Sequence, residues 1–153
     1  MRYFFYGSLM DPTIASIVLD RPVRAHDLQP ATLTGFITVR VRDEHYPALV
    51  RSRDRETAGV LVSDVSAIQA KRLQFYETTE FHQATVEVVT ADGARIETLV
   101  FMPAATLQCT DEPWHFENFL ERAGPEYFRH TRQWMEAFGH TSQHDMQDTW
   151  PGT

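Results

Sequence analysis

The sequence contains little cysteine, few basic residues and no long apolar run. Its one cysteine, Cys109, cannot form an internal disulfide, which suits a reducing compartment. No window reaches the roughly 20 consecutive apolar residues that cross a bilayer. The amino terminus runs directly into a strand pattern, with no charged region, apolar segment and cleavage site before it. We therefore expect a cytoplasmic protein that does not interact with membranes.

Charge and motif content exclude further classes of protein. The 14 Lys and Arg residues are outnumbered by 21 Asp and Glu residues, which gives a net charge of −7. No segment concentrates enough basic side chains to neutralise a run of phosphates, so nucleic acid is not an expected partner. The Gly-x-Ser-x-Gly signature of nucleophilic hydrolases is also absent.

Size and composition predict one ordinary domain. With 153 residues, of which 42% are hydrophobic, the chain can bury a sizeable core, and it shows neither internal repeats nor low-complexity linkers. We expect a single domain over residues 1–138. Residues 139–153 are polar and lack periodicity, so we expect a tail that is mobile or loosely docked.

The first patterned segment is RYFFYGSLMDPT, residues 2–13. Arg2–Tyr6 is rich in residues that favour strands, and a glycine interrupts this run. Asp11 followed by Pro12 is typical of a helix N-cap with proline at the first helical position, which predicts a short helix through Leu19. The predicted order is strand, tight turn, helix.

The remaining elements alternate between short strands and helices. β-branched residues predict strands over 31–41, 46–50 and 56–62, and alternating runs around Asp92-Gly93 predict a hairpin over 81–103. Spacing and capping residues predict helices over 66–76, over 126–138, and from residue 111 or 112 to Gly124 with Pro113 in the first turn. The expected fold class is α+β: a small, curved, mostly antiparallel sheet or barrel with flanking helices.

The turn Gly7-Ser8-Leu9-Met10 is the first candidate for a functional site. It joins the predicted strand to a capped helix, so several of its backbone N–H groups lack partners in regular secondary structure. Amides that point the same way bind a carboxylate or a developing oxyanion. The same residues also fit a simple connection, and the turn alone does not separate the two interpretations.

Glu77 is the second candidate, because it lies where the helix over 66–76 is predicted to end. The negative end of the helix dipole and burial among aromatic residues would each raise the pKa of its carboxyl group. A glutamate with such a pKa is a usable general acid and base near neutral pH. The alternative is a solvated carboxylate in a loop.

Five blocks of sequence, taken together, single out Glu77. They are YGSL at 6–9, PATLTGF at 30–36, YPALV at 46–50, ETAGVLV at 56–62 and LQFYETTEFHQATVEV at 73–88. Their order and spacing resemble the gamma-glutamylcyclotransferase-like family, including its plant avirulence-induced-gene-like branch. The resemblance implies a small barrel, a pocket beside the Tyr-Gly-Ser-Leu turn and an essential glutamate at Glu77. Enzymes of the family release 5-oxoproline from gamma-glutamyl compounds and use neither a metal nor a cofactor.

The same resemblance implies roles for individual residues. The α-amine of the substrate attacks its own γ-carbonyl, and Glu77 serves as the general base and then as the general acid. The residues expected to bind the small gamma-glutamyl substrate are Tyr6, Gly7, Ser8, Leu9 and Tyr46. For Tyr46, an ordinary place in the core fits equally well.

The chain departs from the family pattern after the glutamate. Family members often carry glycine at the next position and Tyr-x-Arg in the following strand, where this chain has Thr78, Phe81 and Gln83. The departing amine stays open between an amino acid, a polyamine, an amine on a biosynthetic intermediate and a protein lysine released as gamma-glutamyl-lysine. The alternative function is a noncatalytic domain that keeps the pocket to bind a small amine or carboxylate.

Other residues fit a site less well. Arg40 and Arg42 would share a strand face, where they either pair with a substrate carboxylate or face solvent. Glu80 is an alternative base, and Cys109 has no histidine partner placed by a motif. Histidines and an aspartate of the tail would share one face of a helix, but the tail lacks an amphipathic pattern, so no metal site is expected at His140, His144 and Asp148.

The aromatic residues between 114 and 138 have two interpretations. They either cover the core or form the surface of a homodimer, and the sequence leaves the oligomeric state open.

Overall fold

The structure is a computed structural model and describes residues 1–139. The predicted tail beyond its first residue lies outside the described residues, and so do His140, His144 and Asp148. Within residues 1–139, no helix is long and apolar enough to cross a bilayer. In the same range, no three His, Cys, Asp or Glu side chains gather as a metal ion would require.

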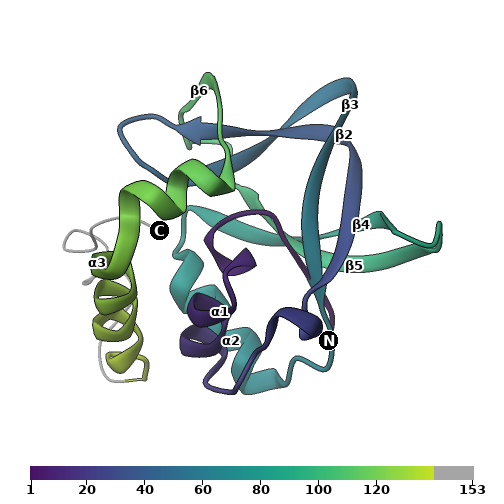
Figure 1. Cartoon of the computed structure of the whole chain (residues 1–153). Helices are drawn as coiled ribbons and strands as arrows, with labels where there is room; N and C mark the ends of the chain where they lie inside the picture. Colours follow the sequence, from purple (N-terminus) through teal and green to yellow (C-terminus); the bar gives the residue numbers. More distant parts are fainter. Residues whose placement is uncertain (140–153) are drawn as a thin grey trace.

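Five strands close into a barrel in the order β3–β1–β5–β4–β2, because β2 also pairs with β3 (Figure 1). The strands are β1 (Tyr3–Phe5), β2 (Gln29–Val41), β3 (Pro47–Val62), β4 (Phe81–Thr90), β5 (Arg95–Pro103) and β6 (Cys109–Pro113), which pairs with the end of β2. Neighbouring strands are antiparallel, except that β1 runs parallel to β5. The α+β fold with a small, mostly antiparallel barrel is confirmed.

The aromatic run at the amino terminus is buried on both faces of the barrel wall. Tyr3 and Phe5 pack with the helices outside the barrel, whereas Phe4 and Tyr6 pack inside it. Each of these four residues is at most 7% exposed. A strand covered on both faces carries a continuous apolar run instead of an alternating one. This burial fixes where the chain leaves the barrel and the Gly7 turn begins.

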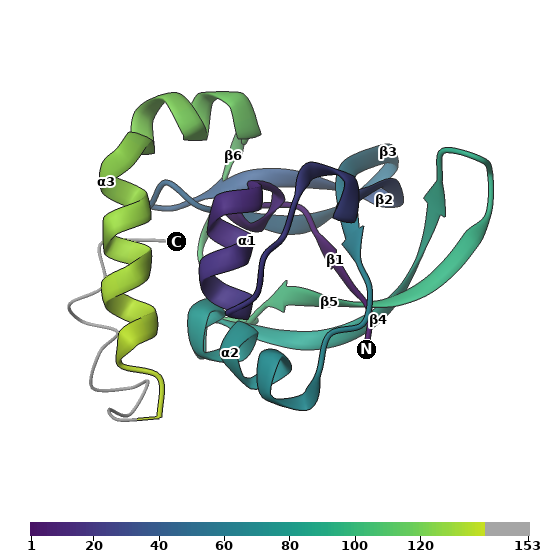
Figure 2. The same ribbon diagram turned by 60° about the horizontal axis from the view of Figure 1, so that its bottom comes forward.

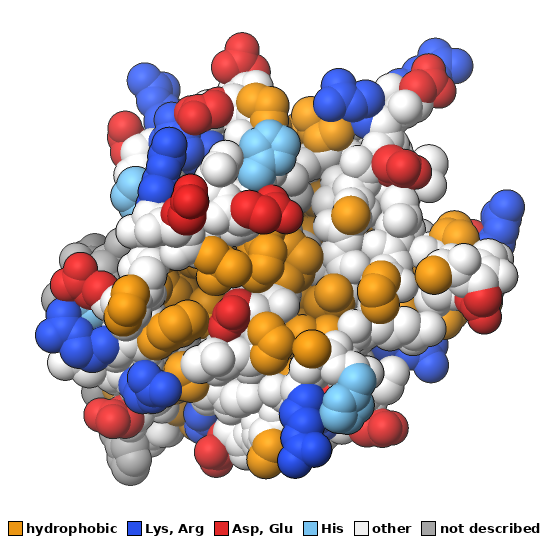
Figure 3. Space-filling model, viewed as in Figure 1, with side chains coloured by type: hydrophobic (Ala, Val, Ile, Leu, Met, Phe, Trp, Pro, Cys, Tyr) orange, Lys and Arg blue, Asp and Glu red, His pale blue; other side chains and the backbone are white. Residues whose placement is uncertain are grey.

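Three helices lie together on one side of the barrel, opposite the projecting β4–β5 hairpin (Figures 1 and 2). They are α1 (Pro12–Leu19), α2 (Ala67–Glu77) and α3 (Phe116–Glu136). Figure 3 shows that hydrophobic side chains gather in the middle of one face, where the helices meet the barrel, with charged side chains around them. This apolar seam holds the helices against the barrel wall.

Capping and breaking residues set the helix ends much as predicted. The Asp11 carboxylate accepts a hydrogen bond from the Ile14 N–H at 3.0 Å and caps α1. Ser66 caps α2 in the same way, with Gln69 completing a capping box. Gly124, at φ 52°, interrupts α3 and separates the two helical segments expected there.

Two predicted strands form one element. The segments 46–50 and 56–62 are joined by exposed charged residues into the single strand β3, which pairs with β2 across a bulge between Thr34 and Phe36. The charged residues suggested a break, and pairing with β2 is interrupted there: Glu56 pairs with Thr34 and Arg51 with Phe36, while residues 52–55 have no partner in β2.

The helix predicted from residue 111 or 112 begins later, at Phe116. Residues Cys109–Pro113 form β6 instead, with Val41 opposite Cys109 and Val39 opposite Pro113. Acidic residues before a proline are typical of a helix start, but pairing with β2 overrides that local preference. Smaller differences are that α2 includes Glu77 as its last residue, that α3 ends at Glu136, and that β2 begins at Gln29.

Replacing Gly59 with alanine is expected to destabilise the barrel by about 3 kcal/mol, because there is no room for a side chain. A Cβ atom at Gly59 would lie 2.4 Å from the Phe5 carbonyl oxygen and 2.5 Å from Cζ of Phe4. Urea denaturation measures the change. Gly93→Ala is the control, since its site is open and only a φ of +86° opposes alanine, at a cost of roughly 1 kcal/mol. Equal losses in the two variants would contradict this account.

Candidate active site

Glu77 and the Tyr6–Leu9 turn meet at one narrow cavity, although they lie about 70 residues apart in the sequence. The cavity has a volume of about 30 Å³, which is room for about one water molecule. It is lined by residues of β1 and the turn after it, of the β2–β3 turn and the start of β3, of the end of α2, and of β4 and β5: Phe4, Phe5, Tyr6, Gly7, Ser8, Leu9, Tyr46, Pro47, Glu77, Phe81 and Phe101. All six residues predicted for the site therefore line the same cavity. Their roles in binding or catalysis stay predictions.

The Glu77 side chain is a carboxyl group without a polar partner. Among residues 1–139, no hydrogen bond or ion pair to this carboxylate is present. The residue as a whole is partly exposed, but its carboxyl group is enclosed by protein. Its burial raises the pKa of Glu77 to about 8. Burial alone explains the shift, so the helix dipole is not needed as a second cause.

The Gly7 turn places free backbone donors beside this carboxyl group. Ser8–Met10 form a short 3₁₀ turn, in which the Met10 N–H donates to the Gly7 carbonyl at 3.0 Å. Within the described part of the chain, the N–H groups of Gly7, Ser8 and Leu9 meet no acceptor. A Cβ at Gly7 would lie 3.1 Å from Cγ of Pro47, so a larger residue would crowd the cavity wall. The turn therefore has donors that an anion could use.

A chain of buried hydroxyl groups leads away from the cavity. The hydroxyl groups of Ser8 and Tyr76 lie 2.6 Å apart, and that of Tyr76 also contacts the hydroxyl group of Tyr127. The Tyr6 hydroxyl donates to the Phe101 carbonyl at 2.6 Å. The sequence singled out Tyr76 only as the neighbour of Glu77 and gave neither Tyr76 nor Tyr127 a role. The position of Tyr76 next to Glu77 was a usable signal, but nothing in the sequence links Tyr127 to the turn.

Thr78 occupies a backbone conformation that normally belongs to glycine. Its φ of 65° and ψ of −172° fall where a side chain with a branched Cβ is strained. The residue is 4% exposed. The family resemblance implies glycine at this position, and Thr78 adopts a backbone conformation that glycine tolerates without strain.

The other two residues that depart from the family pattern, Phe81 and Gln83, each have well-defined contacts. Phe81 is buried and lines the cavity. Gln83 donates a hydrogen bond to the Tyr3 hydroxyl at 2.8 Å, away from the Glu77 cavity. A cation is therefore missing at these two positions, and among residues 1–139 none lines the cavity.

The lesser candidates do not line the Glu77 cavity. Arg40 forms an ion pair with Glu112 at 2.8 Å, and Arg42, which follows β2, donates to Gln108 at 3.1 Å. Glu80 accepts a hydrogen bond from the Tyr46 hydroxyl. Cys109 is half-buried at the start of β6.

Comparison with known sequences identifies a family. A family model described as "Gamma-glutamyl cyclotransferase, AIG2-like" matches residues 3–121. Protein AIG2 C of Arabidopsis thaliana is 29% identical over 141 residues, which cover 86% of this chain and 81% of that protein. AIG2-like protein A of the same plant is 28% identical over 138 residues, with 88% and 77% of the two chains covered.

Solved structures share the fold. A solution structure of an Arabidopsis thaliana protein superposes with a TM-score of 0.62 at 25% identity, over 92% of this chain and 94% of the other. A structure of a gamma-glutamyl cyclotransferase superposes with a TM-score of 0.56 over 86% and 85% of the two chains. At 13% identity, the second likeness shows the fold alone.

Glu77→Gln is expected to stabilise the fold in alkaline solution. The folded-state pKa of about 8 lies above the unfolded value, so the folded chain keeps a proton that the unfolded chain releases. Stability from this group is complete below about pH 4.5 and is lost as the pH rises to about 8. At pH 9 the variant should be more stable by about 2–4 kcal/mol. Thermal unfolding between pH 5 and 9 measures this difference.

The matched control is Glu121→Gln, which removes an exposed acid on α3. It should leave the pH dependence of unfolding as in the wild type. A Glu77→Gln variant that is no more stable than the wild type at pH 9 would contradict the desolvated carboxyl group.

Thr78→Gly is expected to be more stable than Thr78→Ala by about 1–2 kcal/mol, because only glycine relieves the positive φ. Both variants lose the same buried hydroxyl and methyl groups. The control pair is wild-type Ala70 and Ala70→Gly within α2, where glycine should be the less stable by about 1 kcal/mol. Chemical denaturation of the four proteins gives the comparison. If alanine is preferred at both positions, Thr78 is not strained.

Proposed function

Since the chain belongs to the gamma-glutamyl cyclotransferase, AIG2-like family, we propose that it releases 5-oxoproline from a gamma-glutamyl amine or amino acid. Glu77 would act as the general base and then as the general acid. No metal or cofactor takes part in the proposed reaction.

The observation that carries this proposal is the partnerless, desolvated carboxyl group of Glu77 beside unpaired turn amides. An ionised carboxylate that is buried without a cation is energetically unfavourable. The ammonium group of a bound substrate would supply the compensating positive charge. The pKa of Glu77, about 8, matches that of an α-amine, roughly 8. The free energy of proton transfer between the two groups is therefore close to zero, which suits general acid–base catalysis.

The proposed reaction needs no outside reactant. Glu77 accepts a proton from the substrate α-ammonium, and the freed amine nitrogen attacks the γ-carbonyl carbon to form the new C–N bond of the ring. The turn amides of Gly7, Ser8 and Leu9 are suited to the developing oxyanion. The proton on Glu77 then passes to the departing nitrogen as the original γ-amide C–N bond breaks. The second proton that the ring nitrogen must lose passes through Glu77 to the same departing nitrogen, so the products are 5-oxoproline with a neutral amide nitrogen, a leaving ammonium and the Glu77 carboxylate. Ring closure within one bound molecule supplies proximity without a protein nucleophile.

A gamma-glutamyl group is larger than the present cavity of about 30 Å³. Substrate binding therefore requires a wall to move. The best placed wall is the turn over residues 42–46 between β2 and β3, which carries Tyr46. The Tyr46 hydroxyl donates to Glu80. The turn also accepts hydrogen bonds from Trp114 and Arg40 at the His45 and Glu44 carbonyls, so its movement would exchange several hydrogen bonds for contacts with the substrate.

The proposed reaction predicts a bell-shaped dependence of kcat/KM on pH, with its maximum near pH 8. The rate rises with pH as Glu77, with a pKa of about 8, loses its proton and becomes a base. It falls again as free substrate loses the α-amine proton that must be shared with Glu77, at roughly pH 8. Mass spectrometry of 5-oxoproline released from a panel of gamma-glutamyl amino acids and amines measures the profile.

In the same assay, Glu77→Gln should lower kcat/KM by about a hundredfold or more, since it keeps the size of the side chain and removes proton transfer. Glu121→Gln should retain full activity. A profile that is flat from pH 5 to 9 would contradict the role of Glu77. If the wild type binds panel members but releases no 5-oxoproline, the domain is a noncatalytic binding module.

A further inference from the structure

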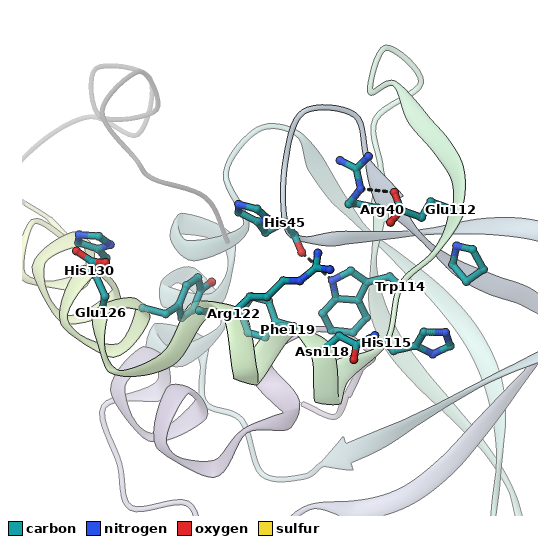
Figure 4. Close-up of a pocket in the computed structure, with 13 residues that line it drawn as sticks. Arg40, His45, Glu112, Trp114, His115, Asn118, Phe119, Arg122, Glu126 and His130 are labelled. Carbon is teal, nitrogen blue, oxygen red and sulfur yellow. Dashed lines mark hydrogen bonds and ion pairs between the residues drawn. The ribbon is translucent and has the colours of Figure 1, made fainter.

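A second, roomier hollow lies on the other side of the β2–β3 turn, and neither Glu77 nor the Gly7 turn lines it. This groove has a volume of about 430 Å³ and runs between that turn, the end of β6 and the first half of α3. Figure 4 shows its side chains. Five of its lining residues follow residue 121, where the family match ends: Arg122, Ala123, Glu126, Tyr127 and His130. The groove is therefore only partly built from the segment that the family shares.

The floor of the groove is aromatic and buried. Trp114, Phe119 and Tyr127 are each at most 8% exposed. Their rings contact one another in series, with centroids 5.6 Å apart for Trp114 and Phe119 and 4.9 Å apart for Phe119 and Tyr127. The Trp114 indole N–H donates to the His45 carbonyl at 2.7 Å and fixes the floor against the turn. Such a floor suits an apolar or aromatic body.

Two arginines and two glutamates line the groove, and Arg122 is the one of these four that is in no ion pair within the described part of the chain. Glu112 is paired with Arg40 at 2.8 Å, and Glu126 is paired with Arg129 at 3.0 Å. Arg122 has neither an ion pair nor a hydrogen bond within residues 1–139. Figure 4 shows its side chain reaching over Phe119 toward Trp114, with His45 across the groove. A ligand with a carboxylate would pair with this guanidinium.

The groove and the Glu77 cavity are neighbours. Tyr127 lies in the floor of the groove, and two hydroxyl contacts, through Tyr76, connect it to Ser8 in the cavity. His45 lines the groove while Tyr46, the next residue, lines the cavity. Burial raises the pKa of both Tyr46 and Tyr127, and the negative charge of Glu77, which lies within electrostatic reach of both, adds to that rise. Movement of the turn over residues 42–46 would join the two spaces.

We propose that the groove holds the leaving part of the substrate and selects an amino acid with an apolar or aromatic side chain and a free carboxylate. The body of the leaving group lies on Trp114 and Phe119, and its carboxylate pairs with Arg122. This inference rests on the proposed function, and it decides among the leaving amines: a polyamine would bring further positive charge to Arg122. The preferred substrates are therefore gamma-glutamyl derivatives of apolar amino acids.

The test compares three substrates of the wild-type protein: gamma-glutamyl-phenylalanine, gamma-glutamyl-phenethylamine and gamma-glutamyl-alanine. The first two differ only in the carboxylate of the leaving group, and the third lacks the aromatic ring. We expect kcat/KM for the phenylalanine substrate to exceed that for the phenethylamine substrate by about tenfold, the effect of one charge-assisted contact. It should also exceed that for the alanine substrate.

The assignment of Arg122 is tested with Arg122→Gln and with Arg132→Gln, a control with the same change at an exposed position of α3 outside the groove. In Arg122→Gln, the ratio of kcat/KM for the phenylalanine substrate to that for the phenethylamine substrate should fall close to one. The fall should come from a higher KM for the phenylalanine substrate, with kcat/KM for the phenethylamine substrate unchanged. Arg132→Gln should keep the preference.

The outcomes separate the two proposals. Release of 5-oxoproline without preference for the carboxylate, or with a preference that Arg122→Gln leaves intact, overturns the assignment of the groove and leaves the proposed function standing. Absence of 5-oxoproline from all three substrates and from the wider panel overturns the proposed function, and the assignment of the groove falls with it.

Discussion

The candidate site depends on one constraint: a carboxyl group held out of water without a partner. Glu77 ends α2 at a wall of aromatic side chains, and burial raises its pKa to about 8. Burial of this carboxyl group destabilises the fold, and the packing of α2 and the capping box at Ser66, where the helix begins, offset that penalty. A group with this environment is poised to exchange a proton with an amine, which links the destabilising feature to the proposed chemistry.

The rest of the architecture serves to bring the Gly7 turn to this carboxyl group. Because β1 is buried on both faces, its position in the barrel wall is fixed, and the turn that follows it cannot shift along the sheet. Pro47 closes against Gly7 from the start of β3. On the outer side, α3 contributes Tyr127 to the hydroxyl chain that reaches Ser8. Two cores, one inside the barrel and one beneath the helices, thus meet at the cavity.

Local signals predicted much of this structure. The Asp11-Pro12 cap, the Asp92-Gly93 hairpin and the break at Gly124 depend on backbone preferences of single residues, so the sequence reveals them directly. The β6 strand was missed, because pairing with β2 decides it and no local pattern reports a distant partner. The charged run in β3 did indicate an interruption, since residues 52–55 have no partner in β2. The strain at Thr78 was likewise hidden, since threonine gives no sign of a positive φ. For the site, family resemblance indicated Glu77 and the turn, whereas the aromatic groove under α3 depends on tertiary packing alone.

The most direct test of the central claim is a ¹³C NMR titration of the Glu77 side-chain carboxyl carbon in the folded wild-type protein, assigned by comparison with Glu77→Gln. The account predicts an inflection near pH 8, the pKa given by burial of this group. An inflection in the ordinary range for glutamate, roughly pH 4–5, would contradict it, since a carboxyl group that is already ionised and solvated has no reason to take a proton from an amine.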